Sequence, residues 1–61
     1  MIEVYILLQG NQYDGYEVYG VYNTREEAIS AYTDASTYVG EHFRIEVWEV
    51  NGGIVSEEYL D

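Results

Sequence analysis

The sequence predicts an α+β fold: a four-stranded antiparallel sheet, with element order β-β-α-β-β and strand order 2-1-3-4, and one helix packed on one face. Three observations predict it. Two segments alternate apolar and polar residues with a period of two, a helix-capping signal lies between two pairs of strand-like segments, and turn-rich clusters join the strands within each pair. A right-handed crossover of the helix over the first strand gives the strand order. The 61 residues form a single domain, because the chain is too short for two.

The first pair of strands spans residues 2–9 and 16–22. In the first strand, one side is strongly apolar and is expected to face the helix, and this side consists of Ile2, Val4, Ile6 and Leu8. The cluster Gly10–Gly15 ends in Asp-Gly and predicts the turn of a hairpin. In the second strand we expect Val18, Gly20 and Tyr22 to point inward, with Gly20 allowing a close approach to the sheet.

The helix is predicted to begin after Thr24, which acts as its N-cap. Glu27 stands three residues later and completes a capping box by bonding back to the cap backbone. Spacings of four, three and four residues then give one apolar stripe that faces the sheet, formed by Ala28, Tyr32, Ala35 and Val39. Gly40 is the expected end of the helix.

The second pair of strands spans residues 42–50 and 54–60, joined by the hairpin signal Asn51-Gly52-Gly53. Phe43, Ile45 and Val47 lie on one side of the third strand and are expected to face the helix. The other side of that strand carries Arg44, Glu46 and Trp48.

Composition excludes several classes of protein. Twelve acidic residues against two basic ones give a formal charge of −10, so nucleic acid would be repelled and is not an expected direct partner. There is no cysteine, which excludes disulfides and thiolate metal sites. The longest apolar run, residues 4–8, is far too short to span a membrane, and the N-terminus lacks the basic region of a signal peptide. A cytoplasmic protein that does not bind membranes is therefore expected.

Catalytic chemistry has no visible basis in this sequence. His42 is the single histidine, there is no lysine, and no serine has a base at a spacing that would activate it. Oxygen ligands occur at Asn11, Asp14 and Glu17, but their spacing is not that of a calcium-binding loop. We therefore expect no enzyme activity, no metal and no cofactor.

The predicted strands repeat a pattern in which a glutamate precedes an aromatic residue by two positions. Residues two apart share a face of a strand, so these pairs are expected to lie on the face away from the helix. Tyr and Trp rings are preferred interface anchors, and Arg44 is available to pair with Glu3, Glu46 or Glu57. The predicted partner-binding residues are Glu3, Tyr5, Glu17, Tyr19, Arg44, Glu46, Trp48, Glu57 and Tyr59. The alternative is that these residues bind nothing, because aromatic residues favour strands and exposed glutamates are simply solvated.

Two segments carry a resemblance to a known group of proteins. Residues 20–28, G-V-Y-N-T-R-E-E-A, resemble small bacterial and phage-borne domains of unknown function that share a G-V-Y-[ST]-x-x-E-E-A segment between a strand and a helix. Residues 45–50, I-E-V-W-E-V, are similar to a strand at the end of those domains. The resemblance implies the β-β-α-β order and transfers no catalytic residue.

Size and charge point to a non-enzymatic acidic binding protein. Such a chain also resembles in kind the small acidic phage inhibitors that disable host enzymes, which implies an inhibitor of a host defence or DNA-processing protein that presents charge as nucleic acid does. The partner would be a protein with a basic surface. The alternative is a homo-oligomeric scaffold or regulatory interaction module. A homodimer is expected in either case, because the apolar area that a chain of this length buries barely offsets its loss of conformational entropy.

Overall fold

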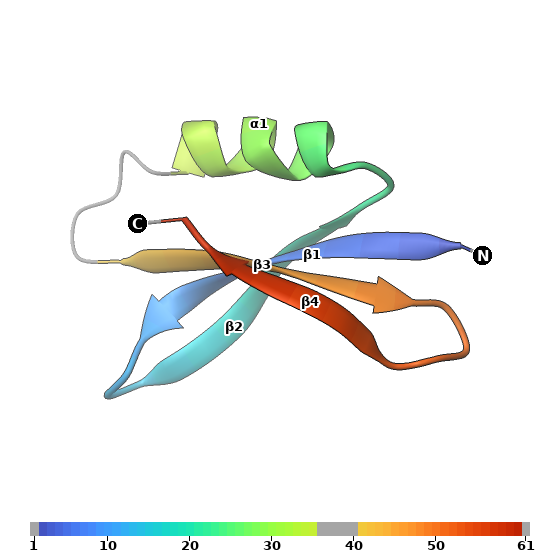
Figure 1. The fold of residues 1–61 in the computed structure, drawn as a ribbon. Coiled ribbons are helices and arrows are strands. Elements are labelled where there is room, and N and C mark those ends of the chain that lie inside the picture. The colour runs from blue at the N-terminus through green and yellow to red at the C-terminus, as the bar shows by residue number, and fades with distance from the viewer. Residues whose placement is uncertain (1, 36–40, 61) are drawn as a thin grey trace.

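The computed structural model describes residues 2–35 and 41–60, and it confirms the predicted α+β fold. The four strands pair antiparallel in the order β2-β1-β3-β4, with the two hairpins joined through the helix. Figure 1 shows α1 lying across one side of the sheet, which we call the helix face. The elements are β1 (Glu3–Asn11), β2 (Gly15–Tyr22), α1 (Arg25–Ala35), β3 (His42–Glu49) and β4 (Ile54–Tyr59).

The first hairpin turns where the sequence predicts it. The Asn11 side-chain oxygen accepts hydrogen bonds from the backbone N–H groups of Tyr13, at 2.9 Å, and Asp14, at 2.8 Å. Such a bond pattern lets one side chain replace the backbone contacts that hold a tight turn. A Cβ atom at Gly10 would overlap the backbone of Gly15, so only glycine fits there.

The helix begins as predicted, with one difference in the cap. The Thr24 hydroxyl accepts a hydrogen bond from the Glu27 N–H, at 3.2 Å, and donates one to the Glu27 carboxylate, at 3.1 Å. The carboxylate therefore bonds to the cap side chain, where the sequence predicted the cap backbone. The predicted stripe residue Val39 and the predicted stop Gly40 lie outside the described residues.

The core lies between α1 and the helix face of the sheet. Among the described residues it consists of five buried ones, namely Leu7, Ala28, Ala35, Phe43 and Ile45. Because α1 contributes mainly alanines, aromatic rings fill the remaining space: the Tyr32 ring meets the Phe43 ring edge-on at 5.3 Å, and the Tyr19 ring meets it at 6.4 Å. Of the seven tyrosines among the described residues, four thus lie on the helix side of the sheet, namely Tyr5, Tyr19, Tyr22 and Tyr32.

The predicted orientation of the first strand is wrong. Directly paired residues of antiparallel strands share a face, and Leu7 pairs with Ile45 while Tyr5 pairs with Val47, so the odd-numbered residues of β1 face the helix. The residues that the sequence predicted to face inward, Ile2, Val4, Ile6 and Leu8, point to the opposite side. The prediction failed because β1 is apolar on both sides, and the register with β3 decides which side meets α1.

Because of a β-bulge, the predicted orientation of the second strand is correct on one side of the bulge and wrong on the other. Gly20 pairs with Leu7 but Val18 pairs with Leu8, which places one extra residue, Tyr19, in β2. Gly20 and Tyr22 therefore face the helix as predicted, whereas Val18 faces away. A Cβ atom at Gly20 would come within 2.7 Å of the Tyr22 ring carbon that bears the hydroxyl, so this glycine allows the ring to lie over the strand.

The second hairpin also forms where it was predicted. Asn51 adopts a left-handed conformation, with φ of 64°, and the Glu49 N–H donates to the Gly53 carbonyl at 3.0 Å. Within the described residues, α1 is the one helix and is too short to cross a membrane.

Candidate functional site

The side of the sheet opposite α1 is the strongest candidate for a functional surface, and we call it the open face. Cross-strand pairing identifies three rows of side chains that run across it. No described helix or strand covers these rows, as Figure 1 shows. A further row at the end of the sheet pairs Gly10 with Tyr16 and His42. With Tyr16, His42 and Ile2, the open face comprises Ile2, Val4, Ile6, Leu8, Tyr16, Val18, Val21, His42, Arg44, Glu46, Trp48, Ile54, Glu57 and Tyr59.

A polar network lies along the centre of the open face. Glu46 accepts one hydrogen bond from an Arg44 guanidinium nitrogen, at 3.0 Å, and a second from the Trp48 ring N–H, at 2.9 Å. The Arg44 guanidinium also lies over the Tyr16 ring, 4.5 Å from its centroid. Of the three pairings predicted for Arg44, the structure forms the one with Glu46. Both charged side chains are only partly exposed, at 21% for Arg44 and 14% for Glu46.

One buried apolar side chain, that of Leu8, lies beside this network on the open face. Leu8 pairs with Arg44 and is buried, yet it stands outside the cluster beneath α1. Leu8 is thus a buried apolar residue of the open face that is separate from the core beneath α1.

Exposed apolar side chains surround the centre of the open face. Val18, Val21, Ile54 and Tyr59 all lie on it, with exposed fractions between 49% and 62%. These side chains lie on the two edge strands, β2 and β4, on either side of the polar network. Several exposed apolar side chains gathered on one face make that face a candidate for an interaction surface.

Charge is distributed unequally between the two sides of the sheet. The open face holds one arginine and two glutamates, a formal net charge of −1, against −10 for the whole chain. Most of the remaining acidic residues lie on α1, on the helix face or in the loops, for example Glu26 and Glu27 in the first turn of the helix. The open face is therefore close to neutral and apolar, not strongly acidic.

The helix side carries the second arginine in an exposed ion pair. Arg25 donates two hydrogen bonds to the Glu58 carboxylate, at 2.6 Å and 3.1 Å. These bonds hold the pKa of Glu58 below its ordinary value of 4.5 and raise the pKa of Arg25. The pair ties the start of α1 to the edge strand β4.

The structure separates the predicted partner-binding residues into two groups. Five of them lie together on the open face: Arg44, Glu46, Trp48, Glu57 and Tyr59. The predicted face is wrong for the other four, because pairing and ring contacts place Glu3, Tyr5, Glu17 and Tyr19 on the helix side. Whether any of the nine contacts a partner stays a prediction.

Sequence reasoning missed most of the apolar residues of the open face. Val4, Ile6, Leu8 and Val18 were assigned to the wrong side, and Tyr16 and Ile54 were not singled out. One signal was present: residues 4–8 form an unbroken apolar run, which is typical of a strand that is buried on both faces.

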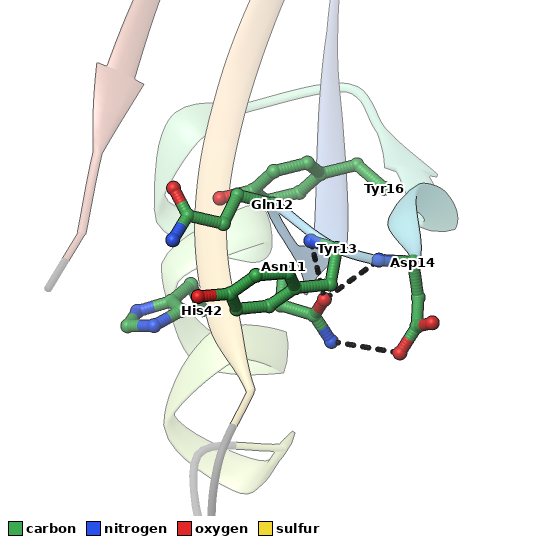
Figure 2. Close-up of a pocket in the computed structure, with 6 residues that line it drawn as sticks. All are labelled: Asn11, Gln12, Tyr13, Asp14, Tyr16 and His42. Atoms are coloured by element: carbon green, nitrogen blue, oxygen red, sulfur yellow. Dashed lines mark hydrogen bonds between the residues drawn. The ribbon is translucent and has the colours of Figure 1, made fainter.

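An open hollow lies beside the first hairpin, at one end of the open face. Asn11, Gln12, Tyr13, Asp14, Tyr16 and His42 line it. Figure 2 shows the polar ends of Gln12, Tyr13 and Tyr16 pointing to the same side as the His42 ring. The Asn11 amide nitrogen donates to the Asp14 carboxylate at 3.3 Å, so the candidate oxygen ligands of this turn bond within the turn itself. Residues 2–35 and 41–60 contain no group of three or more histidine, aspartate or glutamate side chains arranged to hold a metal ion.

Comparison with known proteins supports a family but no activity. No curated protein and no solved structure matches the chain. One family model matches residues 2–56, which covers all five elements except the end of β4. The chain therefore belongs to the family described as Domain of unknown function (DUF7336).

Proposed function

We propose that this domain is a non-enzymatic protein-binding module, and that its open face is the surface that docks on another protein molecule. One observation supports this most strongly. A face that is apolar and nearly neutral is left uncovered in a chain that is otherwise strongly acidic. Leaving such a surface in water is unfavourable, and covering it with protein gains roughly 25 cal/mol per Å² of apolar area.

The residues of the open face suit that role. Trp48 and Tyr59 supply large rigid side chains with polar tips, which are common at the centres of interfaces. The charged pair Arg44–Glu46 is already bonded within the chain, so covering it leaves neither charge without an opposite charge beside it, although the buried Arg44 Nε–H has no hydrogen-bond partner in the described part of the chain. Docking therefore requires little rearrangement of this chain.

Site-specific photo-crosslinking tests the proposal. A benzophenone amino acid replaces Val21 on the open face or, as a matched control, Tyr13 at the tip of the first hairpin, which is 88% exposed. In cells that produce the protein, Val21 is expected to yield a covalent adduct with a polypeptide while Tyr13 yields much less. Equal labelling from both positions, or none from Val21, contradicts the proposal.

A second candidate is an inhibitor of the phage type that occupies the basic groove of a host defence or DNA-processing protein. The net charge of −10 favours it, as does the exposed acidic surface of α1 with Glu26, Glu27 and Asp34. The acidic surface would then be the helix side, and not the open face that the sequence pattern suggested.

Salt dependence separates these two candidates once a partner is crosslinked. Charge mimicry predicts that affinity falls steeply between low and high salt, and that Glu26→Gln with Glu27→Gln slows association. Docking through the open face predicts a weak salt dependence and no effect of those two changes. Loss of affinity on changing Val21 alone would argue against charge mimicry through the helix side.

A further inference from the structure

The size, apolar character and charge of the open face restrict the kind of molecule that can cover it. We infer that its occupant is a second copy of this chain, so that two sheets pack face to face with the helices on the outside. The inference rests on the proposed function and names the partner.

The size of the face supports a broad partner. The two longer extents of the molecule are 36 and 23 Å, which corresponds to a flat face of about 800 Å². A stable interface buries roughly 800 Å² on each partner, so nearly the whole open face has to be covered. A short bound segment covers too little area, whereas a second sheet of the same dimensions covers all of it.

The two faces of β1 point to the same arrangement. Leu7 is fully buried on the helix face, and Leu8, with 8% exposed, is nearly buried on the other. A strand that is apolar on both sides is typical of a sheet covered on both faces, and the chain itself covers only one. Sheets that pack face to face lie about 10 Å apart with their inner side chains interdigitated, which would build a second core around Leu8.

Charge also favours a second copy. Two open faces that meet bring together a formal charge of only −1 each, although each chain carries −10. The acidic helices would lie on the outside, roughly 30 Å apart across two sheets and two helix layers, which is well beyond the screening length of about 8 Å at physiological salt. The distribution of the acidic residues thus removes the main electrostatic obstacle to self-association.

The pairing is expected to be two-fold symmetric, so that each substitution on the open face acts twice. Sedimentation of the purified protein tests it. The wild type is expected to sediment at twice the chain mass of 7.1 kDa at micromolar concentration. Val21→Glu and Val21→Lys, at a position that is 57% exposed, are both expected to raise the dissociation constant by a factor of about 100 or more, because each dimer then buries two unpaired charges.

Three controls keep the result interpretable. Val21→Glu and Val21→Lys change the net charge in opposite directions, so weaker association in both variants has to come from the loss of apolar contact and not from the net charge. Tyr13→Glu adds the same negative charge as Val21→Glu but outside the open face, and this variant is expected to remain a dimer. Circular dichroism establishes that each variant is folded. Ile54→Glu and Ile54→Lys, on the other hairpin, repeat the test if a Val21 variant unfolds.

The outcomes distinguish this inference from the proposed function. A wild type that stays monomeric at about 100 μM overturns the second copy, and a Val21 crosslink to a different protein in cells would then leave the proposed function intact. A dimer that survives all the open-face substitutions also overturns the inference, since association would then use a strand edge, β2 or β4. Monomeric protein with no crosslink from Val21 overturns both.

Discussion

The two faces of the sheet are formed by the same strands, but α1 covers only one of them. On the helix face, Leu7, Phe43 and Ile45 are buried beneath the alanines of α1. On the open face, Val18 and Val21 of the edge strand β2 remain more than half exposed, and Val4 and Ile6 of the central strand β1 are only partly buried. The side of β1 with the more regular run of apolar residues, which includes Val4, Ile6 and Leu8, is therefore not the side that α1 covers. The register of β1 with β3 and the small side chains of α1 determine which side is covered.

The largest expected effect contrasts adjacent residues of β1. Leu7→Ala removes a side chain with no exposed area and is expected to lower the free energy of unfolding by about 3 kcal/mol. Ile6→Ala, on the open face, is expected to lower it by about 1 kcal/mol, because that side chain is only partly buried. Urea denaturation at low protein concentration measures both. A larger loss for Ile6→Ala would mean that the strand faces are assigned in reverse.

A second prediction concerns the network of the open face. Glu46→Ala removes the acceptor for both Arg44 and Trp48 and is expected to destabilise the fold by about 2 kcal/mol, since the Arg44 charge loses its partner while partly buried. Glu57→Ala is the matched control, because Glu57 is exposed beside Glu46 in the same row, and it should change stability by less than about 0.5 kcal/mol. Equal effects would show that the network contributes nothing.

A third prediction tests the close packing on the helix face. Gly20→Ala places a methyl group against the Tyr22 ring, which has to shift, and is expected to cost about 1 kcal/mol. Gly53→Ala is its control, because a Cβ atom there meets nothing within 4 Å. Thermal unfolding followed by circular dichroism compares them, and a Gly20→Ala variant as stable as wild type would argue against the position of the ring.

The smallest expected effect comes from the exposed pair Arg25–Glu58. The folded-state pKa of Glu58 is lowered, so its contribution to stability is complete above the ordinary value of 4.5 and is lost as the pH falls through the folded-state pKa. Wild type is therefore expected to melt slightly above Glu58→Gln at pH 7, with the gap closing in acid. Protonation of the other carboxylates at low pH reduces repulsion in wild type and in Glu58→Gln alike. This general effect therefore cancels in the difference between their melting temperatures. A gap that widens below pH 4.5 would contradict the sign of this shift.

Much of the fold could be predicted because its local signals agree with one another. The cap at Thr24, the Asp14-Gly15 turn and the Asn51-Gly52-Gly53 turn each determine a boundary by backbone chemistry that needs no tertiary contact. Strand order then follows from the handedness of the crossover.

The candidate site was less predictable, because its residues are chosen by tertiary contacts. The face of β1 depends on its register with β3, and the face of Val18 depends on a bulge with no sequence signature that we recognised. The glutamate and aromatic pairs in β3 and β4 were placed correctly, since in β3 the side with Phe43 and Ile45 is clearly more apolar than the side with Arg44 and Glu46. In β1 and β2 no such contrast exists.

The proposal that a second copy of the chain covers the open face can be tested at individual side chains. The test is hydroxyl-radical footprinting of the purified protein over a wide range of protein concentrations. We expect that the oxidation of Trp48, Ile54 and Tyr59 falls together as the concentration rises, while the oxidation of Tyr13 stays constant. Constant oxidation of the open face, or protection confined to Tyr13 and the exposed side of α1, would contradict it.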